Sequence, residues 1–444
     1  MTTTTVPQIA PEDVHRTLAR HILADGYDLV FDYEKSRGAW VHDSRHGRDL
    51  LDFMTFFGSN PIGFNHPKMK DPEFLKVLHR VAQLKPSVSD VYTVEYAAFV
   101  ETFGRIAKPA HVKYAFFIEG GTLGVENALK AAFDWKVRRN RRKGVPGEKG
   151  SQVVHFREAF HGRSGYTLSL TNTDPRKTDN FPKFPWPRID NPKLRFPVSP
   201  EVEADVRAAE EKALGQVRAA FARDPDDIAA IIIEPIQAEG GDNHFRPEFL
   251  QALQRLAREN ECFFIVDEVQ TGIGITGKMW GYEHFGLEPD ALAFGKKMQV
   301  CGCLVSARVD EEPDNVFKVS SRINSTWGGG LTDMVRSARY LEVIEEERLV
   351  DNARVAGERL LRGLADLQAE MDGRMTNARG RGLMIAFDLP STEVRDKVHR
   401  KLVENGLLLL TCGVRSIRFR PPLNLSAAEG DAALDIVRRS LRQI

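Results

Sequence analysis

Apolar residues in the middle of the chain gather in short, nearly continuous runs. These runs fall within residues 114–121, 152–162, 227–237, 262–270 and 290–297. Continuous Ile, Val and Phe without polar alternation is typical of strands that are buried on both faces. Helical patterns such as GVENALKAAFDWKVRR, which begins at Gly124, separate the runs and indicate crossover connections. The pattern predicts an α/β fold with a mostly parallel central sheet and helices on both faces.

The pattern changes beyond about residue 330. A long helical segment is followed by GRGLMIAFDL, a further helix, and the short apolar stretches GLLLL and IRFRPPL. This succession is typical of a smaller α+β domain. We therefore expect three parts: an N-terminal segment, residues 1–65, that packs with the small domain; a large α/β domain, residues 66–328; and a C-terminal small domain, residues 329–444.

The charge and apolar content of the 444 residues argue against several classes of partner. Lys plus Arg and Asp plus Glu both number 62, so no basic surplus favours nucleic acid or an anionic membrane. No apolar run approaches the roughly 18 to 20 residues of a membrane-spanning helix. The N-terminal stretch MTTTTVPQIAPEDV lacks the basic start and apolar core of a signal peptide. We expect a soluble, cytoplasmic protein.

The spacing of the four cysteines fits no common zinc site. They are Cys262, Cys301, Cys303 and Cys412. Nothing in their spacing indicates an oxidising compartment. We expect free thiols and no metal site, with Cys301 and Cys303 more in keeping with buried structural residues than with reactive ones.

Two of the predicted strands end in residues of opposite charge. CFFIVDEVQ delivers Asp267, and DALAFGKK delivers Lys296 and Lys297. Open α/β sheets bind ligands at the carboxyl ends of their strands. Both lysines could reach solvent, since lysine is rarely buried unpaired, or one could be a nucleophilic amine that holds a carbonyl cofactor. Pyridoxal phosphate requires such an amine, and a carboxylate that keeps its pyridine nitrogen protonated.

A glycine-rich turn after the first apolar run supplies a candidate phosphate site. In FFIEGGTLGVENALK, Gly121 and Thr122 precede a helix that is expected to begin near Leu123. Backbone N–H groups at a helix start bind anions, and the Thr122 hydroxyl adds a donor. GGTLG lacks the GxGxxG spacing of dinucleotide sites, and GIGITGK at 272–278 is followed by Met279 where a P-loop requires Ser or Thr. A nucleotide-binding enzyme is therefore disfavoured.

Seven segments together resemble motifs of the class III, ω-amino-acid branch of the pyridoxal-phosphate aminotransferases of fold type I. They are EGGTLGVENALKAAFDWK, AFHGRSGYTLSLTNT, EPIQAEGG, IVDEVQTGIGITGKMW, AFGKK, NSTWGGG and IRFRPPL. The resemblance runs from about residue 14 to the C-terminus. DEVQTG with a later GK is specific for the branch, whereas the second, fifth and sixth segments are more specific for members that act on lysine.

The resemblance implies a cofactor, pyridoxal phosphate, and the residues that bind it in the large domain. Lys296 would form the Schiff base and Asp267 would pair with the pyridine nitrogen. Gln270 would lie near the phenolic oxygen and Phe160 would stack on the ring. The phosphate would be held by Gly121 and Thr122, joined by Thr326 from the second subunit of a homodimer whose active sites lie at the interface.

The resemblance also implies that the ε-amino group of L-lysine is transferred to 2-oxoglutarate in a ping-pong cycle. Its products would be L-glutamate and (S)-2-amino-6-oxohexanoate, which would cyclise to a piperideine carboxylate. Arg163 would bind the distant α-carboxylate of lysine, with Asn324 as a further substrate residue. Arg418 would bind the carboxylate beside the ketone of 2-oxoglutarate, and Glu239 would pair with Arg418 while lysine is bound. If the segment is a strand, Arg420 points to the same face as Arg418, so the choice between them stays open.

Other functions fit parts of the same pattern. The nearest is the same chemistry on another ω-amine, such as ornithine, 4-aminobutyrate or a diamine. A function of another class is a non-catalytic α/β dimer that binds a metabolite or a partner protein. Of the two neighbouring lysines, Lys297 is expected to be a structural charge beside Lys296.

Overall fold

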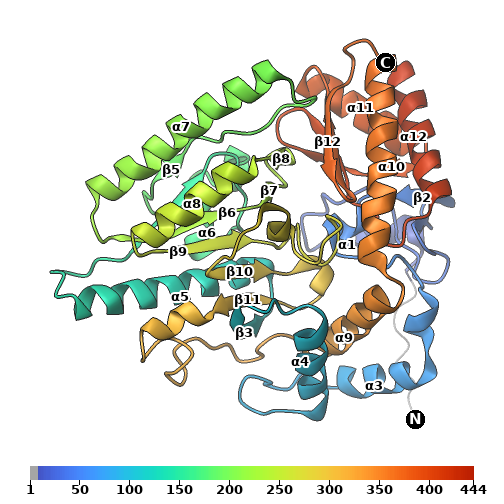
Figure 1. Cartoon of the computed structure of the whole chain (residues 1–444). Coiled ribbons are helices and arrows are strands. Elements are labelled where there is room, and N and C mark those ends of the chain that lie inside the picture. Colours follow the sequence, from blue (N-terminus) through green and yellow to red (C-terminus); the bar gives the residue numbers. More distant parts are fainter. Residues whose placement is uncertain (1–8) are drawn as a thin grey trace.

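A seven-stranded sheet forms the centre of the computed structural model, which describes residues 9–444 (Figure 1). Its strands are β3 Val112–Ile118, β4 Gln152–Phe156, β5 Arg188–Ile189, β6 Ile228–Ile233, β9 Phe263–Asp267, β10 Ala291–Phe294 and β11 Cys301–Ser306. They lie in the order β3, β11, β10, β9, β6, β4, β5, and every neighbouring pair from β10 to β5 is parallel. The predicted mostly parallel α/β sheet is confirmed.

Strand β11 is absent from the predicted set of strands. It runs antiparallel to both of its neighbours, β10 and β3. The chain reverses directly after β10 because Lys296 and Gln299 adopt left-handed φ angles of 51° and 64°. Non-glycine residues rarely adopt such angles, so the sequence gives no signal that this short apolar stretch turns back along the sheet.

Helices cover both faces of the central sheet, because side chains alternate along its buried strands. Helix α5 (Gly121–Arg142) packs on one face, where Ile232 of β6 points. Ile231 and Ile233 point to the other face, where α8 (Pro247–Glu259) and α7 (Pro200–Arg223) pack. Figure 1 shows α5 on the opposite side of the sheet from α7 and α8.

The C-terminal part is built on an antiparallel sheet of four strands in the order β12, β13, β16, β15. Their bounds are Thr376–Arg381, Met384–Asp388, Ser416–Phe419 and Leu410–Cys412. The helices of this part are α10 Leu349–Glu370, α11 Thr392–Glu404 and α12 Ala427–Arg442, and α9 Leu331–Glu346 precedes them and packs on α4 Val94–Ile106 and α3 Pro72–Ala82. This second sheet confirms the predicted smaller α+β unit.

The N-terminal segment joins the C-terminal part through backbone pairing. Strands β1 (Trp40–Asp43) and β2 (Arg48–Asp52) are antiparallel, and β14 (Leu407–Leu408) adds to β2 in parallel. The remaining short elements are α1 Val14–Leu18, α2 Thr55–Gly58, α6 Gly165–Leu170, β7 Ile236–Gln237 and β8 Asn243–His244. The exact division at residues 65 and 328 stays a proposal.

The prediction that the N-terminus is not a signal peptide falls partly on the first eight residues, which lie outside the described part of the chain. Within residues 9–444, no helix combines the length and apolar content needed to cross a membrane. The predicted cytoplasmic location stays a prediction.

Two helical glycines offer a matched test of how tightly α5 packs. A Cβ at Gly124 of α5 would lie 2.6 Å from the backbone oxygen of Gly302 in β11, whereas one at Gly215 of α7 would meet nothing within 4 Å. We expect Gly124→Ala to lower the free energy of unfolding by about 1–3 kcal/mol through overpacking. Gly215→Ala should raise it by up to about 1 kcal/mol, because alanine favours helix. Denaturant titration of both variants beside the wild type measures the difference, and equal stabilities would contradict the close packing.

Candidate active site

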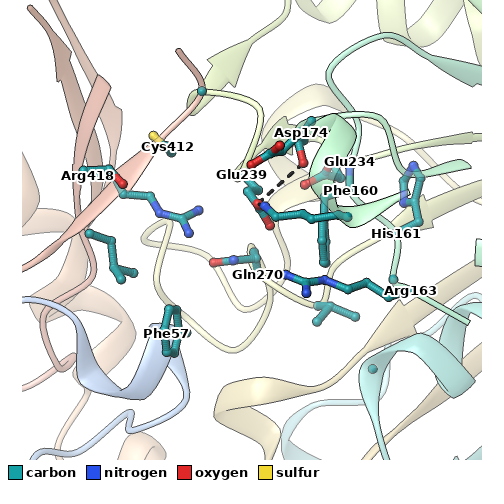
Figure 2. Close-up of a pocket in the computed structure, with 18 of the residues that line it drawn as sticks. Phe57, Phe160, His161, Arg163, Asp174, Glu234, Glu239, Gln270, Cys412 and Arg418 are labelled. Carbon is teal, nitrogen blue, oxygen red and sulfur yellow. Dashed lines mark hydrogen bonds and ion pairs between the residues drawn. The ribbon is translucent and has the colours of Figure 1, made fainter. Parts of the chain in front are cut away.

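A cleft of about 800 Å³ opens at the carboxyl ends of β4, β6, β9 and β10 (Figure 2). This is the edge at which parallel sheets place their ligands. Predicted site residues that line the cleft are Gly121, Thr122, Phe160, Arg163, Glu239, Asp267, Gln270, Lys296 and Arg418. Lining residues that the sequence analysis missed include Tyr27, Phe57, His161, Lys177 and Glu234. The sequence analysis therefore predicted where the cleft lies but missed several of the residues that line it.

Asp267 is a buried carboxylate, 4% exposed, at the end of β9. One oxygen accepts a hydrogen bond from Nδ1 of His161 at 2.8 Å, and the other accepts from the backbone N–H of Val269 at 3.0 Å. Nε2 of His161 is buried without a partner among the described residues. His161 thus fixes the orientation of the carboxylate. It lies in a different loop, 106 residues earlier, so sequence spacing gives no sign of the pair.

Lys296 follows β10, is half-buried, and presents its amine to the cleft. Its Nζ forms no hydrogen bond or ion pair with any described residue. Burial, and then the positive charges of Arg418 and Arg420, lower the pKa of Lys296 to about 8. A larger share of neutral amine is therefore available near neutral pH than in an exposed lysine, as a nucleophile or a base requires.

Lys297 has a different environment, and it does not reach solvent. Its Nζ donates to the backbone oxygens of Gln270 at 2.8 Å and Gly58 at 3.3 Å. Complete burial lowers its pKa well below the usual value of lysine. These two hydrogen bonds connect the turn that contains Lys296 and Lys297 to the loop after β9 and to α2. The alternative in which both lysines extend into solvent is wrong.

The glycine-rich turn meets the loop after β4 at very short range. Helix α5 begins at Gly121, two residues before the predicted start at Leu123. A Cβ at Gly162 would lie 2.1 Å from Oγ1 of Thr122, so only glycine permits this approach. The first turn of α5, with the Thr122 hydroxyl, therefore opens into the cleft as a site for an anion.

Phe160 and Glu234 are adjacent in the cleft wall and are joined by a hydrogen bond. The carboxylate of Glu234 accepts from the backbone N–H of Phe160 and of Ala238, both at 3.0 Å. Burial, and the nearby charge of Asp267, raise the pKa of Glu234 to about 7. The guanidinium of Arg163 lies 5.9 Å from the centre of the Phe160 ring. Glu234 thus holds the loop that presents the predicted stacking residue.

The two arginines of IRFRPP have opposite environments. Arg420 is completely buried and donates two hydrogen bonds to the carboxylate of Asp242, at 2.8 and 2.5 Å, and a longer one to Gln270 at 3.4 Å. Arg418 is also buried, yet its Nε and Nη1 have no partner among the described residues. Since a buried polar group without a partner is costly, Arg418 is the guanidinium left to bind an anion in the cleft.

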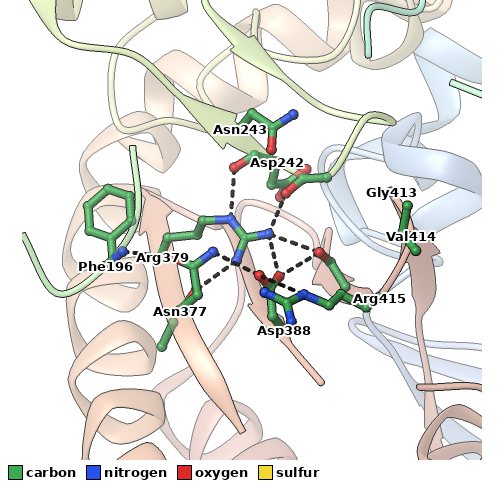
Figure 3. A network of polar contacts seen from close by, with 12 residues as sticks. Phe196, Asp242, Asn243, Asn377, Arg379, Asp388, Gly413, Val414 and Arg415 are labelled. Atoms are coloured by element: carbon green, nitrogen blue, oxygen red, sulfur yellow. Dashed lines mark hydrogen bonds and ion pairs between the residues drawn. The ribbon is translucent and has the colours of Figure 1, made fainter. Parts of the chain in front are cut away.

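A second arginine clamps the loop that contains Asp242 (Figure 3). Arg379 of β12 donates to the backbone oxygens of Asp242 at 3.1 Å and Gly241 at 2.5 Å. The same guanidinium bonds Ser416 and forms an ion pair with Asp388 at 2.8 Å. All of its polar contacts are satisfied inside the protein, so Arg379 has a structural role in joining the two sheets.

Glu239 does not form its predicted contact with Arg418. Among the described residues no ion pair joins it to Arg418; instead it pairs with Lys177, and Thr173 Oγ1 lies 3.5 Å from it. The expected Glu239–Arg418 pair is therefore not formed in this structure. The reason is that the loop between α6 and β5 brings Lys177 into the cleft, and the sequence pattern does not place that loop.

Thr326 and Asn324 lie outside the cleft of their own chain. The backbone oxygen of Thr326 accepts hydrogen bonds from Ser87 and Ser89, and Asn324 bonds Asp90 at 3.3 Å. The neighbouring Trp327 is 46% exposed. These two predicted site residues therefore do not join the other nine within one chain.

Comparison with known proteins agrees with this geometry. The family described as aminotransferase class-III matches residues 22–441. The chain belongs to the class III aminotransferases. The L-lysine-epsilon aminotransferase of Mycobacterium tuberculosis strain H37Rv is 51% identical over 97% of this chain and 96% of its own. That of Streptomyces clavuligerus is 49% identical over 99% and 96%. Human mitochondrial 4-aminobutyrate aminotransferase is 32% identical over 90% and 82%.

Solved structures agree with the same assignment. Lysine aminotransferase from M. tuberculosis in the internal aldimine form matches with a TM-score of 0.96 and 51% identity, over 98% of this chain and 100% of that one. Ornithine aminotransferase from Toxoplasma gondii matches with a TM-score of 0.79 and 25% identity, over 98% and 94%. The predicted fold type and enzyme class are confirmed.

Pyridoxal phosphate is the cofactor of this enzyme class, and the residues present fit it. The cleft contains an uncommitted, half-buried amine at Lys296, a buried carboxylate at Asp267, an aromatic wall at Phe160 and an anion site at Thr122. These are the amine, carboxylate, stacking surface and phosphate cradle that the cofactor requires. The predicted cofactor is confirmed, whereas the role of each residue stays a proposal.

The buried pair between Arg420 and Asp242 should contribute far more stability than an exposed pair of the same type. Removing one charge from a fully buried pair leaves the other uncompensated, so Asp242→Asn should cost about 3–5 kcal/mol of unfolding free energy. The exposed pair between Arg359 and Asp431 is the control, and Asp431→Asn should cost at most about 1 kcal/mol. Denaturant unfolding of both variants measures the two costs. Similar values would contradict the proposed importance of the buried pair.

Proposed function

We propose that the protein transfers the ε-amino group of L-lysine to 2-oxoglutarate. The products are L-glutamate and (S)-2-amino-6-oxohexanoate, which closes to a piperideine carboxylate. Four arginines line the cleft, and two of them, Arg176 and Arg395, pair with carboxylates. The observation that carries this proposal is that the other two guanidinium groups, Arg163 on one side and Arg418 on the other, have no carboxylate partner among the described residues (Figure 2). Two positions are needed because the carboxylate of lysine is distant from its reacting amine, whereas one carboxylate of 2-oxoglutarate adjoins the reacting ketone.

The choice of lysine over other ω-amines is supported by the relatives. Proteins named L-lysine-epsilon aminotransferase are 49–51% identical to this chain over nearly its whole length. Proteins named 4-aminobutyrate aminotransferase are 32–34% identical. Substrate-binding residues diverge between branches of a family more readily than its fold, so the nearer group is the better guide to the amino donor.

Lys296 has the chemical properties needed for covalent cofactor binding and for proton transfer. When bound, pyridoxal phosphate supplies an electron-withdrawing ring that stabilises negative charge at the carbon beside the substrate amine. The amine of Lys296 would be the covalent anchor. Once the amine of the substrate has displaced it, it would accept the proton lost from the ε-carbon of lysine and, as a general acid, donate that proton to the cofactor. Its pKa of about 8 suits both tasks, because either protonation state is accessible near neutral pH.

The other residues of the cleft hold the reacting groups in place. Asp267, oriented by His161, provides the carboxylate for the pyridinium nitrogen. Phe160 covers one face of the ring, and Gln270 lies near its phenolic oxygen. Gly121 and Thr122 hold the phosphate at the start of α5. None of these groups changes its bonding during proton transfer, so they act by binding and orientation.

Arg163, Arg418 and Glu239 select the two substrates. Arg163 binds the α-carboxylate of lysine with its planar fork of donors. Arg418 binds the carboxylate beside the ketone of 2-oxoglutarate. While lysine is bound, Glu239 pairs with Arg418 and prevents it from capturing the α-carboxylate, which would place the wrong amine at the reacting position.

The protein is proposed to act as a homodimer with an active site at each interface. Thr326 and Asn324 lie outside the cleft of their own chain, which suits residues that complete the cleft of the second subunit. The adjoining surface exposes large apolar side chains, including Trp327 at 46% and Leu123 at 40%, beside the phosphate site. Exposed apolar surface of this kind marks interfaces. A monomer in light scattering would contradict this proposal.

The substrate assignment is tested by single-turnover reactions of the cofactor-loaded enzyme. L-Lysine, L-ornithine and 4-aminobutyrate are each mixed with it, and the change in cofactor absorbance gives the rate. We expect lysine to be the fastest by at least tenfold, because the chain length between its carboxylate and its reacting amine fits Arg163. Equal or faster reaction of ornithine would exclude the lysine assignment, and a colourless protein without reaction would favour a non-catalytic binding protein.

The two neighbouring lysines should respond differently to substitution. Lys296→Ala removes the covalent anchor and the proton-transfer group, so visible absorbance should no longer be fixed to the protein by borohydride, and turnover should fall by at least about a thousandfold. Lys297→Met removes only backbone contacts, so borohydride should still fix the cofactor while thermal stability falls. Mass spectrometry of the reduced proteins identifies the modified residue. Attachment at Lys297 would contradict the assignment.

A further inference from the structure

Lys177 is the cleft residue whose role neither the family resemblance nor the proposed reaction explains. It lies in the loop between α6 and β5, and its amine pairs with the carboxylate of Glu239. The two side chains are 20% and 21% exposed, so the pair lies at the edge of the cleft rather than in bulk solvent. Thr173 from the same loop lies 3.5 Å from the same carboxylate.

The surroundings of Lys177 make its contact with Glu239 exchangeable. Its amine lies 5.6 Å from the centre of the Phe160 ring. Partial burial, and then the nearby charges of Arg163 and Arg418, lower the pKa of Lys177, whereas the charge of Asp174 opposes this effect. Lys177, Arg163 and Arg418 thus lie in one cleft, close enough for their charges to act on one another. A partly exposed ion pair contributes only about 0 to 1 kcal/mol, so Glu239 can leave Lys177 at small cost.

Glu239 is also the carboxylate left to neutralise Arg418. Asp242 is committed to Arg420 through two hydrogen bonds. Glu234 is committed to the backbone N–H groups of Phe160 and Ala238. Arg418 has two buried nitrogen atoms without a partner among the described residues. Lys177 and Arg418 thus compete for one carboxylate.

We propose that Lys177 is the alternative partner of Glu239 and keeps Arg418 free for a dicarboxylate. This inference rests on the roles of Glu239 and Arg418 in the proposed function and deepens it. With Glu239 on Lys177, the cleft accepts the carboxylate of an α-keto diacid. With Glu239 on Arg418, it accepts a substrate whose carboxylate is distant from the reacting amine. Lys177 is a positioning residue for substrate choice, since it acts through Glu239.

The test measures binding of glutarate, a dicarboxylate that cannot react, to the cofactor-loaded protein by titration calorimetry. Lys177→Met should raise the Kd of glutarate about three- to fivefold, near the upper end expected for loss of a partly exposed ion pair, because Glu239 then shifts onto Arg418. In a Glu239→Gln background the same substitution should change the Kd less than twofold, because no carboxylate is left to mask Arg418. Arg176→Met is the matched control. It removes a cation from the same loop that pairs with Asp174 instead, and it should alter the Kd less than twofold.

Lysine provides the second readout. The concentration of lysine at half-maximal single-turnover rate should not rise in Lys177→Met, because the arrangement with Glu239 on Arg418 is favoured. Weaker binding of both glutarate and lysine would indicate general damage and overturn the proposal. An equal loss of glutarate affinity with and without Glu239 would also overturn it, because Lys177 would then bind the carboxylate directly. Failure of lysine to react with the wild type would refute only the lysine assignment, since the glutarate measurements do not depend on it.

Discussion

The buried ion pair between Arg420 and Asp242 is the contact on which the geometry of the cleft depends. It joins β16 of the C-terminal sheet to the loop that carries Glu239, and both side chains are 0% exposed. Arg379 holds the backbone of the same loop from β12 (Figure 3). A fully buried pair gains little net energy over apolar packing but is costly to break. The two sheets are thereby fixed at one relative position, and Arg418, two residues from Arg420, always faces the cleft.

This arrangement separates committed charges from exchangeable ones. Arg420, Asp242 and Glu234 have complete sets of partners inside the protein, so substrate cannot redirect them. Nε and Nη1 of Arg418 lack partners among the described residues, and Glu239 lies in a partly exposed pair. A cleft that accepts both a monocarboxylate donor and a dicarboxylate acceptor needs some charged groups that can change partners. Because the neighbouring charges are fixed, only Glu239 and Arg418 are left to do this.

The sequence analysis predicted the strands, their ends and the glycine turn, which follow from local pattern. It missed residues whose positions depend on contacts between distant parts of the chain. Continuous apolar runs ending in Asp267 and Lys296 were enough to place both residues at one edge of a parallel sheet, and the glycine turn was enough to place Thr122 at the start of a helix beside the same cleft. His161, Lys177 and Asp242 were missed because each enters the site from a loop whose path depends on tertiary packing. The strand β11 was missed because it follows an abrupt reversal at left-handed backbone angles, which the apolar pattern does not encode.

The order of the site residues along the chain has a consequence for synthesis. Every residue of this chain that is proposed to contact the cofactor lies between Gly121 and Thr326, whereas Arg418 lies on β16, the last strand of the C-terminal sheet, and Arg420 follows soon after that strand ends. During translation, the part that binds the cofactor emerges first, and the part that selects the acid substrate emerges near the end. The proposed ligand of the acceptor carboxylate is therefore the last part of the site to be synthesised, and a prematurely ended product would contain Arg163, Glu239 and Lys296 without Arg418.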